Sequence, residues 1–84
     1  MADNLTLDRL APGESARVVS LASEGPERRR LLDLGFVPGA QIRASLRSPL
    51  GDPTAYEVRG ALIALRREQA ARITVEPLEV TADA

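Results

Sequence analysis

The segment RRRLLDLGFVPG, residues 28–39, constrains the fold of this chain more than any other, because it specifies a helix together with its end. Pro26 lies just before it, at a first helical position where the missing N–H group costs no hydrogen bond. Gly35 stands where a left-handed C-terminal cap is expected, and residues 37–39 form a turn signal. The sequence therefore predicts a helix over residues 26–34 with an apolar arc of Leu31, Leu32 and Leu34.

Three consecutive arginines, Arg28, Arg29 and Arg30, occupy the first two turns of this predicted helix. The helix dipole favours anions at that end, and only Glu27 offsets the positive charge. Helical spacing places Arg29 beside Asp33 on the outer face. Two interpretations stay open: the arginines bind an acidic surface of a partner protein, or they form an ordinary solvated face.

The composition indicates one small domain with an aliphatic core. The chain has 84 residues, of which 44% are hydrophobic, and Phe36 and Tyr56 are the only aromatic side chains. The net charge is −1, so no global positive field would hold a nucleic acid, and no nucleic-acid partner is expected. We expect the domain to span residues 1–84, ordered over about 7–77, with 1–6 and 80–84 loose.

The residue types that are absent exclude several classes of enzyme. The chain contains no Lys, His or Cys. Walker-type phosphate loops, Schiff-base chemistry, and Ser-His-Asp or Cys-His catalysis each need at least one of these residues. No catalytic residue and no required cofactor are therefore predicted. No secretory signal or membrane-crossing run is visible, which favours a cytoplasmic protein without direct membrane insertion.

Short alternating segments predict a mainly β fold. Strands are expected over residues 15–21, 40–47, 54–59, 61–65 and 73–75, with a single helical turn over 67–71 before the last strand. Five strands with one helix inserted after the first predict a small, closed, five-stranded β-barrel in which the first and last strands pair. The expected core residues are Val18, Leu31, Leu34, Ile42, Leu46, Val58, Leu65, Ile73 and Val75.

The turn at residues 49–53 is a second candidate contact for a partner. Its Pro and Gly residues fix backbone angles, while Leu50 offers an apolar anchor and Asp52 a polar contact. A purely structural turn is the alternative. Divalent metal could be held only weakly, because the available ligands are scattered carboxylates: Glu24, Glu27, Asp52, Glu76 and Glu79.

Several segments together resemble the FeoA-type accessory proteins of bacterial ferrous-iron uptake. The resemblance extends from Leu7 to Glu76 and is carried by Leu7, Leu10 and the segments PGE (12–14), RRRLLDLGFVPGA (28–40), SPLGDP (48–53), YEVRG (56–60) and LIALRREQAARITVE (62–76). The positions that match the family are Leu31, Leu34, Gly35, Pro38, Gly39, Pro49, Leu50, Gly51, Pro53, Gly60, Leu65, Arg66 and Ala70.

The resemblance implies an SH3-like, non-enzymatic cytoplasmic protein that works with the FeoB membrane transporter, whose soluble part is a GTPase. Contact through Arg28, Arg29, Arg30, Leu50 and Asp52 would then regulate the transporter, and homodimer formation stays open. Similar barrels form the C-terminal domain of iron-dependent repressors. The alternative function is therefore a metal-responsive module that binds a divalent metal or another regulatory protein.

Overall fold

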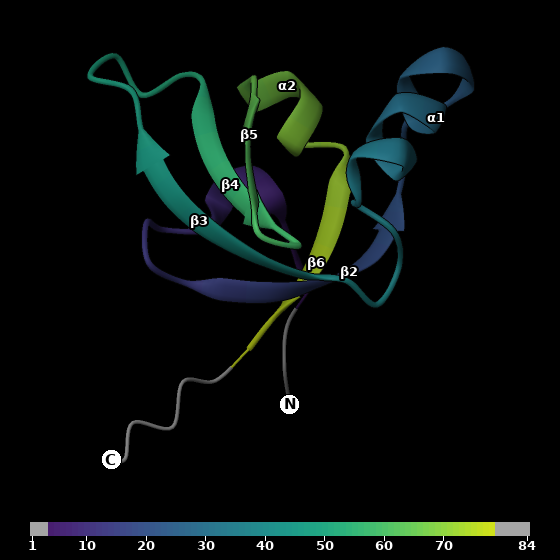
Figure 1. The fold of residues 1–84 in the computed structure, drawn as a ribbon, viewed down its shortest axis with the longest axis horizontal. Coiled ribbons are helices and arrows are strands. Elements are labelled where there is room, and N and C mark those ends of the chain that lie inside the picture. The colour runs from purple at the N-terminus through teal and green to yellow at the C-terminus, as the bar shows by residue number, and fades with distance from the viewer. Residues whose placement is uncertain (1–3, 79–84) are drawn as a thin grey trace.

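A computed structural model describes residues 4–78, which form one antiparallel sheet with three helical segments beside it (Figure 1). The six strands lie in the order β1-β6-β2-β3-β4-β5. The helical segments are η1 (Leu7–Arg9), α1 (Gly25–Leu34) and α2 (Arg67–Ala70). The strands are β1 (Leu5–Thr6), β2 (Ser15–Leu21), β3 (Gln41–Arg47), β4 (Thr54–Val58), β5 (Ala61–Leu65) and β6 (Ile73–Pro77). The predicted mainly β, SH3-like class and the predicted pairing of the first and last long strands, β2 with β6, are confirmed.

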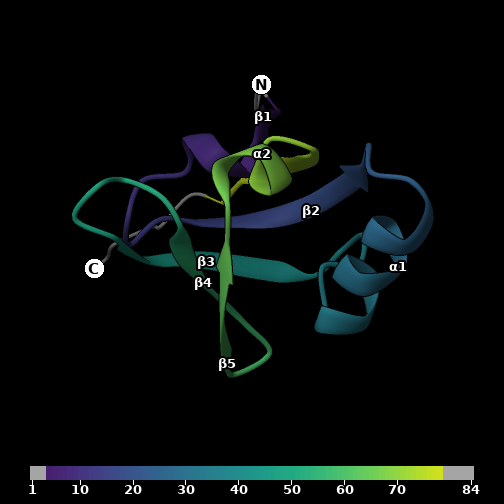
Figure 2. The ribbon, with the colours of Figure 1, turned by 90° about the horizontal axis from the view of Figure 1, so that it is seen from above.

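Two details of the predicted barrel are wrong. The sheet has six strands, because Leu5 and Thr6, expected in a loose segment, pair with Val75 and Thr74 of β6. The sheet is also open, since β1 and β5 are its two edges. The chain between β5 and β6 forms α2, which contacts η1. Helical turns therefore lie where β1 and β5 would have to pair to close the barrel, as the view in Figure 2 also shows. The residues expected to be loose at 1–3 and 80–84 lie outside the described part of the chain.

The core is aliphatic around two buried aromatic rings, Phe36 and Tyr56. Seven of the nine predicted core residues are buried, and Leu34 is half-buried against the core. Leu46 is the exception, with 68% of its surface exposed. The buried residues are Leu7, Leu10, Ala16, Val18, Leu21, Leu31, Phe36, Ile42, Ala44, Tyr56, Val58, Leu65, Ala70, Ile73 and Val75.

A β-bulge explains the misplacement of Leu46. In the pairing of β3 with β4, Ala44 lies opposite Tyr56 but Arg47 lies opposite Thr54, so β3 carries one extra residue between them. An extra residue shifts the two-residue alternation of a strand. Leu46 therefore faces solvent, and the Arg47 guanidinium reaches back to donate a hydrogen bond to the Leu10 carbonyl over 3.2 Å.

Helix α1 ends as its sequence predicts. Gly35 is left-handed, with φ of 112°, and its N–H donates to the Leu32 carbonyl over 3.0 Å. The Phe36 N–H donates to the Leu31 carbonyl, also over 3.0 Å. This pattern of hydrogen bonds is the Schellman cap, which turns the chain sharply out of the helix. The cap sends Phe36 into the core and starts the turn that leads to β3. No helix among residues 4–78 is long and apolar enough to cross a membrane.

Candidate functional site

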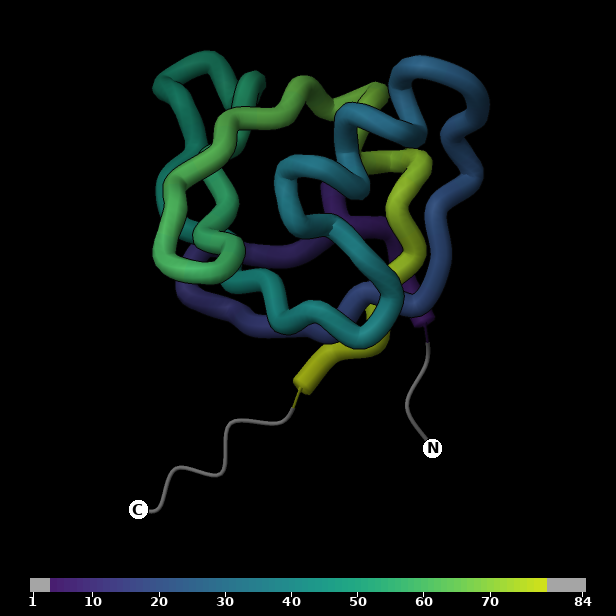
Figure 3. The backbone as a smooth tube through the Cα atoms, turned by 45° about the vertical axis from the view of Figure 1, so that its right-hand side comes forward, coloured from purple at the N-terminus to yellow at the C-terminus, as the bar shows by residue number. Residues whose placement is uncertain are grey.

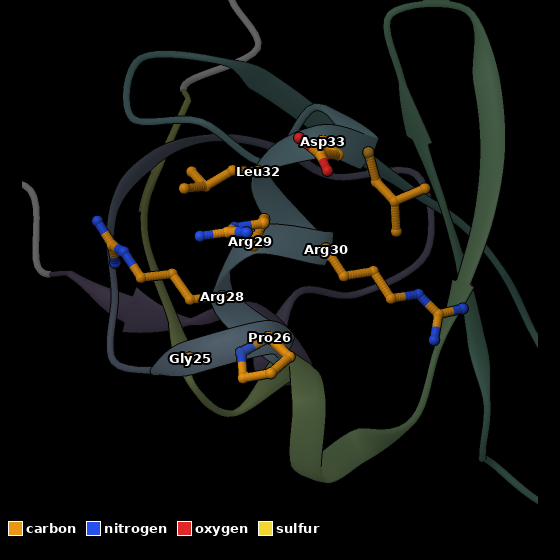
Figure 4. A pocket seen from close by; sticks show the side chains of 8 residues that line it. Gly25, Pro26, Arg28, Arg29, Arg30, Leu32 and Asp33 are labelled. Atoms are coloured by element: carbon orange, nitrogen blue, oxygen red, sulfur yellow. The ribbon is translucent and has the colours of Figure 1, made fainter.

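Helix α1 projects from the sheet and carries the arginine cluster on its outer side. Figure 4 shows Arg28 and Arg30 extending to opposite sides of the helix, with Arg29 between them. Together with Pro26 and Leu32 these arginines line a shallow hollow on the surface. All three arginines are exposed. The surface thus combines exposed cationic groups with a partly buried apolar side chain.

Arg28 has a structural partner that the other two arginines lack. Its Nη1 donates to the Leu21 carbonyl over 3.2 Å, which ties the first turn of α1 to the end of β2. Within residues 4–78, Arg29 and Arg30 form neither a salt bridge nor a side-chain hydrogen bond. The expected closeness of Arg29 to Asp33 therefore does not extend to an ion pair. Arg29 and Arg30 are the members of the cluster that keep their full hydrogen-bonding capacity for a partner.

Glu27 does not neutralise the arginines of its own helix. Its Oε1 accepts a hydrogen bond from Arg72 over 2.9 Å, and this contact is one of the two salt bridges found in the described part of the chain. Arg72 follows α2, so the pair joins the start of α1 to the segment before β6. The positive charge of Arg29 and Arg30 is left uncompensated at the helix N-terminal half.

The loop between β3 and β4 presents Leu50 to solvent, with 92% of its surface exposed. Asp52 instead has an internal role, because its Oδ1 accepts a hydrogen bond from the Arg67 N–H over 2.8 Å. Its own N–H donates to Ser48 Oγ over 3.0 Å. Asp52 thus fixes the loop to the first residue of α2, and Leu50 is the residue that the loop holds outward.

The two candidate contacts lie at opposite ends of the molecule. In Figures 1 and 2 the β3–β4 loop and α1 lie on opposite sides, with α2 between them, and the tube in Figure 3 separates them in the same way. The structure therefore does not combine the arginines and Leu50 into one compact patch. A single partner that contacts both must extend over this whole face.

The carboxylates proposed as metal ligands remain scattered. Among residues 4–78, no three acidic side chains come together as a group that could hold a metal ion. Glu27 is paired with Arg72 and Asp52 with the Arg67 backbone, while Glu24 precedes α1 and Glu76 lies in β6. Glu79 lies outside the described residues.

Sequence reasoning missed a groove between α1 and the edge strand β5. Arg30 and Leu34 from the helix line it together with Leu62 and Ile63 from the strand. Leu62 is 60% exposed, although it lies in the longest apolar run of the chain. A short uninterrupted apolar run is typical of a buried strand, so the sequence carried no signal that Leu62 is exposed at the sheet edge.

The family model described as the FeoA domain matches residues 5–77, which includes every strand and helix. The chain belongs to the FeoA family.

Relatives of this FeoA chain include a fusion protein and two solved structures. It is 39% identical over 72 residues to the Fe(2+) transport protein A/Fe(2+) transporter FeoB fusion protein of Porphyromonas gingivalis, covering 86% of this chain and only 8% of the fusion protein. The FeoA protein from Chlorobium tepidum is 43% identical with a TM-score of 0.85, covering 89% of this chain and 71% of that one. FeoA of Stenotrophomonas maltophilia, described as a prokaryotic SH3 domain protein complexed with zinc, is 35% identical with a TM-score of 0.76, covering 84% and 88% of the two chains.

Iron- and manganese-dependent repressors share the fold alone. IdeR of T. acidophilum is 23% identical with a TM-score of 0.76, covering 88% of this chain and 34% of that one. Identity at this level carries the architecture and no function. The comparisons therefore place the chain in the FeoA family, and the repressors contribute the fold alone.

Proposed function

We propose that this FeoA chain is a non-enzymatic cytoplasmic accessory protein that binds the GTPase part of a FeoB-type transporter and regulates ferrous-iron uptake. The observation that carries the proposal is the fusion of a 39% identical relative to FeoB in one polypeptide. Fusion into one polypeptide holds the two domains at a high local concentration and so favours their association. It is therefore expected for domains that bind one another as separate proteins.

The charge distribution supports α1 as one contact. Arg29 and Arg30 are exposed and make no ion pair within residues 4–78, so binding an acidic surface would break no existing interaction. The helix dipole disfavours cations at this end, and a carboxylate of the partner would relieve that cost. Arginine pairs with carboxylates through two parallel N–H groups, which would fix orientation as well as affinity.

Leu50 supports the loop as a second, separate contact. Its side chain is 92% exposed, while the Asp52 carboxylate and Ser48 hold the loop to the rest of the domain. A rigid loop that presents one apolar side chain loses little conformational entropy on binding. Because α1 and the loop lie at opposite ends, the transporter domain would lie across the face that includes α2.

The test is direct binding between this chain and the cytoplasmic part of FeoB from the same organism. Isothermal titration without nucleotide, with GDP and with a non-hydrolysable GTP analogue should give stoichiometric binding whose affinity differs between nucleotide states. By linkage, the chain must then change nucleotide affinity by the same factor. The absence of binding in all three states would overturn the proposal.

A Leu50→Asp variant tests the loop contact within the same experiment. Leu50 packs against nothing that a charge would disrupt, so the melting temperature should stay within about 1 °C of the wild type. Binding should weaken at least about tenfold, because an apolar anchor is replaced by a charge that must be desolvated. Leu46→Asp is the matched control, since Leu46 is also exposed but lies in β3.

A further inference from the structure

A second pocket, distant in sequence from the arginine cluster of α1, lies between η1, the β3–β4 region and α2. It has a volume of about 250 Å³. Three arginines and one carboxylate line it, together with one buried hydroxyl from each of two β4 residues: Asp8, Arg9, Arg47, Arg67, Thr54 and Tyr56. In a chain with a net charge of −1, this is a local concentration of positive charge.

The bulge in β3 and the hydrogen bonds of the loop create the cationic side of the pocket. The bulge shifts the register of β3 between Ala44 and Arg47, which changes the side of the strand on which Arg47 lies. Arg47 Nη2 donates a hydrogen bond to the Leu10 carbonyl. Asp52 fixes the backbone of Arg67 at the start of α2. Within residues 4–78, none of the pocket arginines forms a salt bridge. Guanidinium groups without a carboxylate partner are suited to binding an anion.

The Asp8 carboxylate and the Tyr56 hydroxyl determine which hydrogen-bonding groups the ligand must provide besides a negative charge. Asp8 Oδ1 is buried and has no hydrogen-bond partner among the described residues. Buried polar oxygens are nearly always paired, so this carboxylate requires a hydrogen-bond donor, and rotation about its Cβ–Cγ bond can turn either oxygen to one. Tyr56 lies beside it, with its hydroxyl donating to the Leu7 carbonyl over 3.3 Å. Burial, and secondarily the Asp8 charge, raise the pKa of Tyr56, so this group stays a neutral donor.

We infer that this pocket binds inorganic phosphate. Oxygens of the anion would accept hydrogen bonds from the guanidinium groups of Arg9, Arg47 and Arg67, which lie on three different elements. The remaining P–OH group would donate to the Asp8 carboxylate. The inference does not depend on the transporter as partner, because none of Arg29, Arg30 and Leu50 lines this pocket, although Gly51 of the β3–β4 loop does.

The Asp8 carboxylate makes the site selective by the protonation state of the ligand. Near pH 8 inorganic phosphate is predominantly a dianion that keeps one hydroxyl group. Sulfate has no proton at this pH, and a phosphate monoester has lost its second proton, since its second pKa is about 6. Both would place an oxygen lone pair against the carboxylate. Inorganic phosphate alone among these three anions therefore satisfies both the arginines and Asp8.

The experiment compares the three anions by isothermal titration at pH 8, using the whole chain in phosphate-free buffer. Potassium phosphate should bind at least about tenfold more tightly than sulfate or guanosine monophosphate, as expected from one charge-assisted hydrogen bond. Arg9→Gln and Arg67→Gln should each weaken phosphate binding by a similar factor. Arg17→Gln, which removes an exposed arginine of β2 outside the pocket, should leave it unchanged.

Asp8→Asn is the deciding variant, because an amide can donate to a fully deprotonated oxygen. It should reduce the preference for phosphate over sulfate to about twofold or less. If Asp8→Asn does not fold, nuclear magnetic resonance of the wild-type arginine side chains during phosphate and sulfate titrations still tests whether the pocket prefers phosphate. Equal binding of phosphate and sulfate by the wild type, an unchanged preference in Asp8→Asn, or no phosphate binding would each overturn the inference.

Discussion

Tyr56 is the single tyrosine of the chain, so its ionisation can be followed alone by ultraviolet absorbance. Burial is the main cause that raises the pKa of its hydroxyl above the usual 10.0, with the Asp8 charge acting in the same direction. The folded state therefore holds its proton at pH values where the unfolded chain has lost it. The protonated Tyr56 hydroxyl therefore contributes to the stability of the folded state. This contribution is fully present below pH 10.0 and is lost as the pH rises through the pKa that Tyr56 has in the folded state. Titration of native Tyr56 at or below pH 10.0 would contradict this account.

Leu31 and Leu46 form a matched pair that tests the bulge in β3. Leu31 is 1% exposed and Leu46 is 68% exposed, although both lie on positions that the sequence pattern assigns to the core. Leu31→Ala should lower the free energy of unfolding by about 2–5 kcal/mol, because it leaves a cavity. Leu46→Ala should change it by less than about 0.5 kcal/mol. Urea denaturation of both variants measures the difference, and equal losses would place Leu46 in the core and remove the bulge.

At the scale of elements, the end of α1 depends on a glycine for two separate reasons. Gly35 has φ of +112°, and a Cβ atom there would lie 2.8 Å from Val58 Cγ1, in β4. Gly39 has φ of +93°, but a Cβ atom there would have no neighbouring atom within 4 Å. Gly39→Ala should therefore cost only the backbone strain, about 1 kcal/mol. Gly35→Ala should cost about 1–3 kcal/mol more, because the helix cap must move away from the sheet. Thermal unfolding of the two variants separates the cost of backbone strain from the cost of the clash with β4. Equal losses of stability in the two variants would mean that the end of α1 does not pack on β4.

The elements that sequence reasoning located well are those defined by local signals. Strands β2 and β5 and the cap at Gly35 follow from alternation, turn residues and a glycine at a left-handed position. The bulge and β1 could not be found in this way. A bulge depends on the register against β4, and a two-residue strand exists only because β6 offers it a free edge. Both are set by pairing between segments distant in sequence, which a local pattern does not encode.

At the scale of the whole molecule, a local sequence pattern also fails to place the residues of the candidate site relative to one another. The sequence named Arg29, Arg30 and Leu50 among the candidate contacts for a partner, and all three are exposed. It did not separate them from Arg28 and Asp52, whose hydrogen bonds reach the Leu21 carbonyl and the Arg67 N–H. Nor did it reveal that α1 and the loop lie at opposite ends of the fold. These facts depend on tertiary contacts that the order of residues along the chain does not show.

The arginines of α1 carry the proposed electrostatic contact with the transporter, and removing two of them should not harm the fold. Arg29 and Arg30 make no hydrogen bond or ion pair within residues 4–78, and their charges oppose the helix dipole. The double variant Arg29→Ala/Arg30→Ala should therefore be at least as stable as the wild type. The double variant Arg17→Ala/Arg43→Ala removes the same charge from exposed positions of β2 and β3 and serves as its control.

The most direct measurement is the affinity of these two double variants and the wild type for the cytoplasmic part of FeoB, at low and high salt. The α1 variant should bind at least about tenfold more weakly than the wild type at low salt and should lose much less affinity as salt rises. The control variant should follow the wild type within about twofold at both salt concentrations. Wild-type affinity and salt dependence in the α1 variant would contradict a cationic contact through this helix.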